Sequence, residues 1–282
     1  MRKKRKLFCQ LSPTAYRISV KKGCVLRWLH DLLVLARFSK ERPEALLPAT
    51  VYRHNALIRR TLGAADPALQ ENKAVNLAIA APRISHVLIR PGETFSFWRL
   101  VGSCTEKKGY QTGMVIENGQ VGRGIGGGLC QLTNLIHWMV LHTPLTITEH
   151  HHHDSVDLFP DFGRQVPFGT GTSIFYNYVD YRFRNETDIT FQLIVWVEEK
   201  YLCGELRADR LPPLKYHIAI QDEAFIREAD GVYRTGKVYR RAVDRDTGNT
   251  VACALIKENH ARVLYALEDE NRVVLQPELV LK

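Results

Sequence analysis

A run of glycine followed at once by an apolar helical pattern is the feature that most constrains this chain. Five of the seven residues from Gly122 to Gly128 are glycine, and Leu129-Cys130-Gln131 comes next. Apolar residues then recur at helical spacing through Leu141. The order predicts a tight loop that leads into a helix, with Cys130 close to the helix N-terminus.

Turn and capping signals divide the rest of the chain. A helix is expected over 68–81, with Asp66 as its N-cap and Pro82 as its end. Asn118-Gly119 predicts a hairpin. Strands are expected at 85–89, 94–98, 112–117, 120–121, 145–148, 173–184, 189–198, 217–220, 232–238 and 251–255, with a turn at 246–249.

These elements predict an α+β fold: N-terminal helices, antiparallel strands around the glycine-rich loop and its helix, and a strand-rich C-terminal extension. Hydrophobic residues make up 45% of the 282 residues, which is enough to bury a core. We expect a basic N-terminal tail and helical segment over 1–66, a core domain over 67–205 and a β-rich extension over 206–282.

The positive charge is concentrated at the N-terminus. Of the 39 Lys and Arg residues, eight lie in residues 1–24, which leaves 31 against 30 acidic residues in the remainder. A nearly neutral body argues against nucleic acid as a partner, because binding to phosphates needs a basic face on the folded domain. The tail is either a solvated terminus or a peripheral contact with an anionic membrane through residues 1–38.

Residues 25–36 carry an apolar helical pattern that is interrupted by Arg27, His30 and Asp31. The stretch is shorter than the roughly 20 residues of a membrane span, and no signal peptide is evident. The sequence therefore predicts a cytoplasmic or membrane-peripheral protein. We expect the apolar face of this helix to pack on the domain, with a position on the membrane as the alternative.

Cys130 is the candidate nucleophile. Unpaired N–H groups and the helix dipole stabilise a thiolate at a helix N-terminus. The glycines allow backbone N–H groups to converge on a substrate oxygen. The alternatives are a buried cysteine behind a mobile loop and a phosphate site, although the G-x-G-x-x-G spacing is absent. No two of the six cysteines form a C-x-x-C pair.

Four consecutive histidines, His150–His153, form the second candidate feature. On an extended strand His151 and His153 share one face and His150 and His152 the other. We expect the first pair to face Cys130, where one of them is the base for the thiol. An exposed polar loop is one alternative. A metal site completed by Glu149 or Asp154 is another, but no metal and no cofactor is predicted.

Four motifs stand in an order that resembles the VanW family. They are Pro91-Gly92-Glu93-Thr94-Phe95-Ser96-Phe97, Gly126-Gly127-Gly128-Leu129-Cys130-Gln131, Glu149-His150-His151-His152-His153 and Asp180-Tyr181-Arg182-Phe183-Arg184-Asn185-Glu186-Thr187, and they cover roughly residues 70–200. The chain carries Gly163-Arg164-Gln165 where family members often carry Gly-Arg-Asp.

The resemblance implies a VanW domain in the cell envelope with a role in vancomycin resistance. For some VanW-domain proteins it implies a cysteine-dependent L,D-transpeptidase activity on peptidoglycan stem peptides or precursors. Cys130 then matches the nucleophile, and His151 and His153 match the paired histidines. We expect Gly126, Gly127, Gly128 and Gln131 to contact the substrate and Arg164 to bind its carboxylate. The alternative is a non-catalytic module that binds wall precursors or a resistance enzyme.

Overall fold

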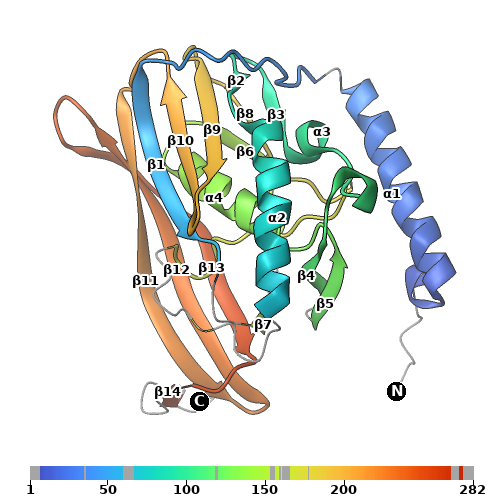
Figure 1. Cartoon of the computed structure of the whole chain (residues 1–282). Helices are drawn as coiled ribbons and strands as arrows, with labels where there is room; N and C mark the ends of the chain where they lie inside the picture. Colours follow the sequence, from blue (N-terminus) through green and yellow to red (C-terminus); the bar gives the residue numbers. More distant parts are fainter. Residues whose placement is uncertain are drawn as a thin grey trace.

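The computed structural model describes residues 7–34, 36–59, 67–117, 120–152, 156–158, 160, 166–176, 178–267 and 273–275. Within these ranges it has an α+β fold, in which helices cover several mainly antiparallel sheets (Figure 1). The predicted fold class is confirmed, and the C-terminal half is rich in strands, as expected.

A four-stranded antiparallel sheet lies at the centre of the core. Its strands run in the order β1 (Ala49–Leu57), β10 (Tyr201–Ala208), β9 (Phe191–Val197) and β2 (Val87–Ile89). The helices α2 (Pro67–Ile84) and α4 (Cys130–Leu141) pack against it. Apolar side chains from both helices and from the sheet are buried together, among them Leu77, Leu135, Phe191 and Leu206.

The expectation that Pro82 ends its helix is wrong, because α2 continues to Ile84. Proline removes one N–H group that would bond to the preceding turn, and its ring crowds the carbonyl of that turn. Ile84 is fully buried, and the next residue, Ser85, donates its N–H to Ala81 O at 2.9 Å. Burial of this last turn outweighs the lost hydrogen bond and the crowding.

Smaller elements surround the glycine-rich loop. A three-stranded sheet has the order β3 (Thr94–Ser96), β8 (Arg182–Arg184), β6 (Thr146–Glu149), and α3 (Phe97–Val101) and a 3-10 turn (Glu106–Lys108) follow β3. The predicted hairpin is confirmed: β4 (Thr112–Glu117) pairs with β5 (Gln120–Ile125), with Glu117 opposite Gln120. Residues 118 and 119 lie outside the described ranges, as does the expected N-cap, Asp66.

The strand expected over 173–184 is largely absent, because only its end forms β8. The residues just before β8 are attached to β3 and α3 through the side chain of Asp180 and not through a strand ladder. The carboxylate of Asp180 accepts the N–H groups of Trp98 (3.1 Å) and Tyr181 (2.9 Å) and the hydroxyl of Ser96 (2.5 Å).

Three long strands dominate the C-terminal region. They belong to a five-stranded sheet with the order β14 (Val273–Leu275), β11 (Leu214–Glu228), β12 (Gly231–Asp244), β13 (Thr250–Val263) and β7 (Val156–Asp157). The predicted turn at 246–249 joins β12 to β13. The expected boundary at 205/206 falls inside β10, and β1 comes from the segment expected to be helical. The division into three domains stays a prediction.

The N-terminal helix α1 (Pro13–Leu33), preceded by a 3-10 turn (Phe8–Gln10), lies on the outside of the core (Figure 1). It begins earlier than expected because Ser12 caps it, accepting the N–H of Ala15 at 3.1 Å. The expectation that its apolar face packs on the domain is wrong, since its two buried residues are Ala15 and Asp31. No helix in the described part of the chain is long and apolar enough to cross a membrane.

Candidate functional site

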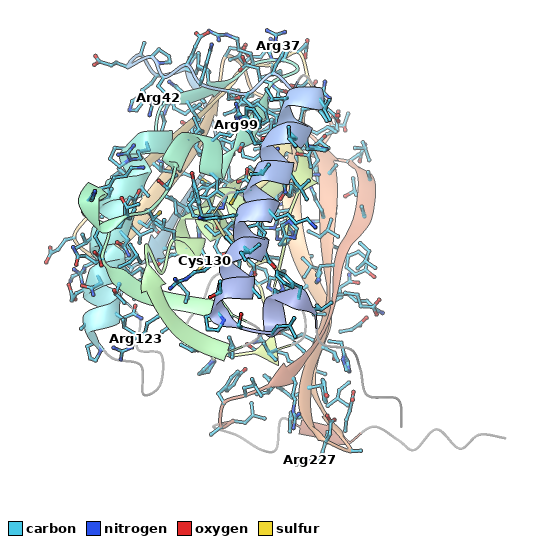
Figure 2. The ribbon with its side chains drawn as sticks, turned by 90° about the vertical axis from the view of Figure 1, so that its right-hand side faces the viewer. Arg37, Arg42, Arg99, Arg123, Cys130 and Arg227 are labelled. Carbon is cyan, nitrogen blue, oxygen red and sulfur yellow. The ribbon has the colours of Figure 1, made fainter. Side chains whose placement is uncertain are left out.

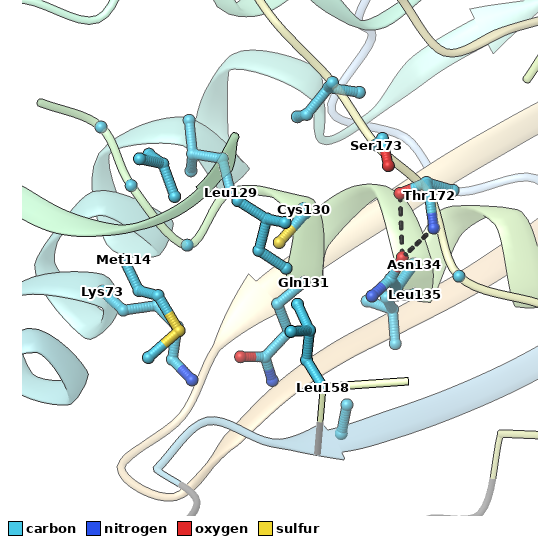
Figure 3. A pocket seen from close by; sticks show the side chains of 18 of the residues that line it. Lys73, Met114, Leu129, Cys130, Gln131, Asn134, Leu135, Leu158, Thr172 and Ser173 are labelled. Carbon is cyan, nitrogen blue, oxygen red and sulfur yellow. Dashed lines mark hydrogen bonds between the residues drawn. The ribbon is translucent and has the colours of Figure 1, made fainter. Parts of the chain in front are cut away.

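A cavity of about 780 Å³ lies beside the N-terminus of α4. The glycine-rich loop, α2, β1 and the Thr172–Tyr176 segment contribute to its lining, and so do residues after the histidine run, such as Val156 and Leu158. Figure 3 shows the Cys130 thiol pointing into this space, between Lys73 and Met114 on one side and Asn134 and Thr172 on the other. The cavity is mainly apolar, with Cys130 at its wall.

The glycine-rich loop reaches its position by packing backbone against backbone. A Cβ added at Gly127 would overlap the backbone of Gly113 in β4, and one added at Gly113 would overlap Gly127. The buried amide of Asn76 donates to Gly127 O at 2.9 Å and to Gln111 O at 3.0 Å. Only glycine at both positions permits this approach, which delivers Cys130 to the cavity.

Burial raises the pKa of the Cys130 thiol above its ordinary value. The positive charge of Lys73 and the N–H groups of Cys130 and Gln131 act in the opposite direction without cancelling that effect. The sequence correctly placed Cys130 at a helix N-terminus, but the expected thiolate is disfavoured because desolvation outweighs the dipole. The thiol is therefore protonated at neutral pH unless a base removes its proton.

Lys73 contributes a cation to the cavity wall. Its side chain lies against Gly128, where any Cβ would overlap the lysine methylenes, and its Nζ donates to Gln70 Oε1 at 2.7 Å. Gln70, Lys73 and Asn76 are all buried on one face of α2. The spacing of these three polar residues, at intervals of three, was the signal in the sequence. That signal was not used to predict the site.

Asn134 lies one helical turn after Cys130, on the same face of α4. Its Oδ1 accepts the N–H of Thr172 at 2.6 Å and the Thr172 hydroxyl at 2.9 Å (Figure 3). The Thr172 hydroxyl also contacts that of Thr133. These contacts fasten the 172–176 segment to α4 and set the far wall of the cavity. Asn134 was not predicted, although its spacing from Cys130 was a usable signal.

Of the three described histidines in this run, His151 points away from the other two, and the side of His150 and His152 meets the cavity. His152 lines the cavity together with Cys130, whereas His151 is exposed and its Nε2 lies 3.1 Å from Glu149 Oε1. A side chain at Gly171 would contact His152 Nε2 at 3.1 Å and Asn134 Oδ1 at 3.8 Å. The expectation that His151 faces Cys130 is therefore wrong, and His153 lies outside the described residues.

A stacked histidine pair explains the choice of face. The ring of His150 stacks on that of His137 in α4 at 4.3 Å, and its Nε2 lies 2.8 Å from Gly171 O. His137 in turn contacts the buried Tyr181 hydroxyl at 3.1 Å. Burial, followed by the charges of His150 and His152, holds the pKa of His137 well below its ordinary value. A neutral His137 thus anchors His150 inward and leaves His152 at the cavity.

The remaining predicted residues divide between the cavity and undescribed ranges. Gly126, Gly127, Gly128 and Gln131 all line the cavity. The N–H of Gly127 donates to Gly124 O at 3.1 Å, so it is engaged within the loop and not directed at a substrate. Gln131 Nε2 donates to Leu57 O at 2.8 Å. Arg164 lies outside the described residues.

The described residues contain no group of three or more His, Cys, Asp or Glu side chains placed to hold a metal ion. All six cysteines are described, and each is a free thiol. The chemistry that this arrangement offers is a thiol, an imidazole and an ammonium group around a mainly apolar space.

Comparisons with known proteins place the chain in a family. Residues 72–207 match the family model described as "VanW like protein". The chain is 35% identical over 226 residues to the vancomycin B-type resistance protein VanW of Enterococcus faecalis, covering 80% of this chain and 82% of that protein. It is 29% identical over 119 residues to the uncharacterized protein YoaR of Bacillus subtilis, covering 41% of this chain and 36% of that protein. No solved structure matches the chain significantly.

Proposed function

Because this chain belongs to the VanW family, we propose that it acts on peptidoglycan as an accessory of glycopeptide resistance, through cysteine-dependent transpeptidation of the L,D type. The relative from Enterococcus faecalis, a vancomycin B-type resistance protein by name, supports the resistance context. The position of Cys130 in the wall of a cavity that Lys73 and His152 also line carries the proposal for the chemistry.

In the proposed reaction His152 takes the proton of the Cys130 thiol, and the thiolate attacks an amide carbonyl of a stem peptide. The C–N bond breaks as the leaving amine takes the proton from His152, and a thioester remains. The amino group of a second stem peptide then attacks the thioester carbonyl. Its proton returns through His152 to the sulfur. One peptide bond is exchanged for another, so no co-reactant is needed.

Lys73 fits the charge of such a donor. The terminal residue of a stem peptide, which leaves in this reaction, carries a free carboxylate. An ammonium group held against the glycine-rich loop would attract that carboxylate and place the neighbouring carbonyl near the thiol. Its charge also favours the thiolate, so Lys73 assists binding and nucleophile formation together.

One observation favours a second candidate, the non-catalytic binding module. Burial raises the pKa of Cys130, and a neutral thiol in an apolar cavity behaves as a small hydrophobic residue. In this function the cavity binds the stem peptide of a wall precursor, or a segment of a resistance enzyme, and Cys130 contributes packing only.

Mass spectrometry of muropeptides incubated with the wild-type protein and with Cys130→Ala tests the enzyme. We expect cross-linked product and a thioester adduct for the wild type and neither for the variant. Cys253→Ala, which removes an exposed thiol on β13, is the matched control and should keep full turnover. Peptide binding without turnover by both the wild type and Cys130→Ala would establish the binding module instead.

The histidines give a second, internal test. His152→Ala should reduce turnover by about 100-fold or more, the usual contribution of a general base, whereas His151→Ala should retain most of it. The pH profile of the wild type should rise with deprotonation of the base, and His152→Ala should lose that limb. Equal losses for the two variants would exclude His152 as the specific base.

A further inference from the structure

The helix α1 packs on the core through a small, polar face and leaves its apolar face exposed. A row of small and polar residues at intervals of four points inward, namely Ala15, Ser19, Gly23, Arg27 and Asp31. Large apolar side chains point outward, with Trp28 57% exposed and Leu33 82% exposed. The outer apolar residues are Leu7, Phe8, Leu11, Tyr16, Ile18, Val25, Leu26, Trp28, Leu29, Leu32 and Leu33.

Ion pairs attach the inner row to the core. The apolar face of α1 therefore points outward while the helix is docked on the protein. Arg27 makes a bidentate pair with Glu149 at 2.6 and 2.7 Å. Asp31 makes a second bidentate pair with Arg182 at 2.6 and 2.9 Å. These pairs fix which face of α1 meets the core. Turning the helix to bury Trp28 and Leu29 would break both.

The exposed side of α1 is also basic. Arg17, Lys21 and Lys22 are exposed on the helix, and Asp31, the single carboxylate within residues 1–40 of the sequence, is buried. In the sequence, Arg2-Lys3-Lys4-Arg5-Lys6 directly precedes the described residues. Aromatic and aliphatic side chains bordered by cations, with no exposed carboxylate, match an anionic lipid surface.

From this charge and polarity pattern we infer that α1 and the preceding turn bind the surface of an anionic membrane. The apolar outer face enters the headgroup region, and the basic side chains contact lipid phosphates. Figure 2, in which α1 stands toward the viewer, shows this outer side along the length of the helix. The binding is peripheral and requires no membrane span.

Membrane binding would place the cavity on the side of α1 that faces away from the lipid. Cys24 Sγ lies 3.5 Å from the carbonyl oxygen of Tyr176, a residue that also lines the cavity. The helix therefore borders the site that we assign to the wall peptide. This inference does not depend on that function, since it rests on α1 alone.

Cosedimentation of the whole 282-residue chain with vesicles tests the inference. We expect binding to vesicles of phosphatidylcholine with phosphatidylglycerol and little binding to phosphatidylcholine alone. Binding should weaken steeply with added salt. Lys21→Gln with Lys22→Gln should lower the apparent affinity by about fivefold for each charge removed. Lys40→Gln with Lys107→Gln, which removes two exposed charges elsewhere, is the matched control and should change it little.

Substitutions of the apolar face complete the test. Trp28→Asp with Leu32→Asp should abolish vesicle binding without changing the thermal unfolding midpoint, because both side chains are exposed. Val251→Asp with Leu255→Asp on the exposed part of β13 is the control and should bind as the wild type does. Binding that persists without Trp28 and Leu32, or that is insensitive to salt, would overturn the inference. So would a dimer in light scattering that the same substitutions dissociate, since a second copy would then cover the face.

Discussion

The helices α1 and α2 have similar lengths, 21 and 18 residues, but attach to the core by different forces. On α2, Leu77, Ala80, Ala81 and Ile84 are almost fully buried against the core. On α1, the inward face is small and polar, and the apolar residues face outward. Helical periodicity is present in both segments, so periodicity alone does not tell which face a protein buries.

The two attachments differ in what they contribute. Burying an aliphatic side chain stabilises a fold by roughly 1.5–3 kcal/mol, and α2 contributes several. A buried ion pair loses solvation as it forms, so the Asp31–Arg182 pair determines position more than it adds stability. We therefore expect α2 to unfold with the core and α1 to detach on its own.

The largest effect should come from the core helix. Leu77→Ala leaves a cavity between α2 and the sheet and should lower the free energy of unfolding by about 2–5 kcal/mol. Urea denaturation followed by circular dichroism measures this loss. Val75→Ala, at an exposed position of the same helix, is the control and should cost far less. Similar losses for both would mean that α2 is not held by burial.

Removing a buried charge should release α1 without unfolding the core. Asp31→Asn breaks the bidentate pair with Arg182. Once α1 has detached, water solvates the Arg182 guanidinium, so no unpaired charge stays buried. The loss is then limited to the docking free energy of the helix, about 1–3 kcal/mol. Hydrogen exchange should show α1 amides losing protection while α2 amides keep theirs. Equal loss of protection in both helices would contradict separate docking.

Acid should act on the same contact. Burial alone would raise the pKa of Asp31, but the hydrogen bond and charge of Arg182, with the charges of Arg99 and Arg27, lower it overall. A carboxylate whose pKa is lower in the folded state stabilises it above the unfolded value, about 3.9, and loses that contribution as the pH falls further. Hydrogen exchange should thus show α1 loosening below about pH 4, and less pH dependence in Asp31→Asn.

The smallest effect should come from a leucine on the outer face of α1. Leu29→Ala should change the free energy of unfolding by less than about 0.5 kcal/mol in the absence of lipid, because the side chain is 43% exposed. The same leucine-to-alanine change at Leu77 is the counterpart. A loss above 1 kcal/mol, measured by urea denaturation, would show that Leu29 packs on the protein after all.

Local signals were sufficient for elements whose geometry depends on a few neighbouring residues. The hairpin at Asn118-Gly119 and the loop-to-helix step at Cys130 were both predicted from short patterns. Alternation in the histidine run was predicted as well. The face that meets the cavity was not, because it is decided by the stacking of His150 on His137 in a different element. Pro82 was misjudged for the same reason, since burial of Ile84 keeps the last helical turn.

By itself the sequence determined the α+β class, the family motifs and the position of Cys130 at a helix N-terminus, because backbone preferences and motif order are local properties. Only the tertiary structure decided that Lys73, Asn134 and His152 line one cavity together with Cys130, that the pKa of its thiol is raised, and that α1 exposes its apolar face. These outcomes depend on desolvation and on ion pairs between residues far apart in the chain, such as Arg27 with Glu149. Free energies of that kind belong to the packed molecule and have no counterpart in a local pattern.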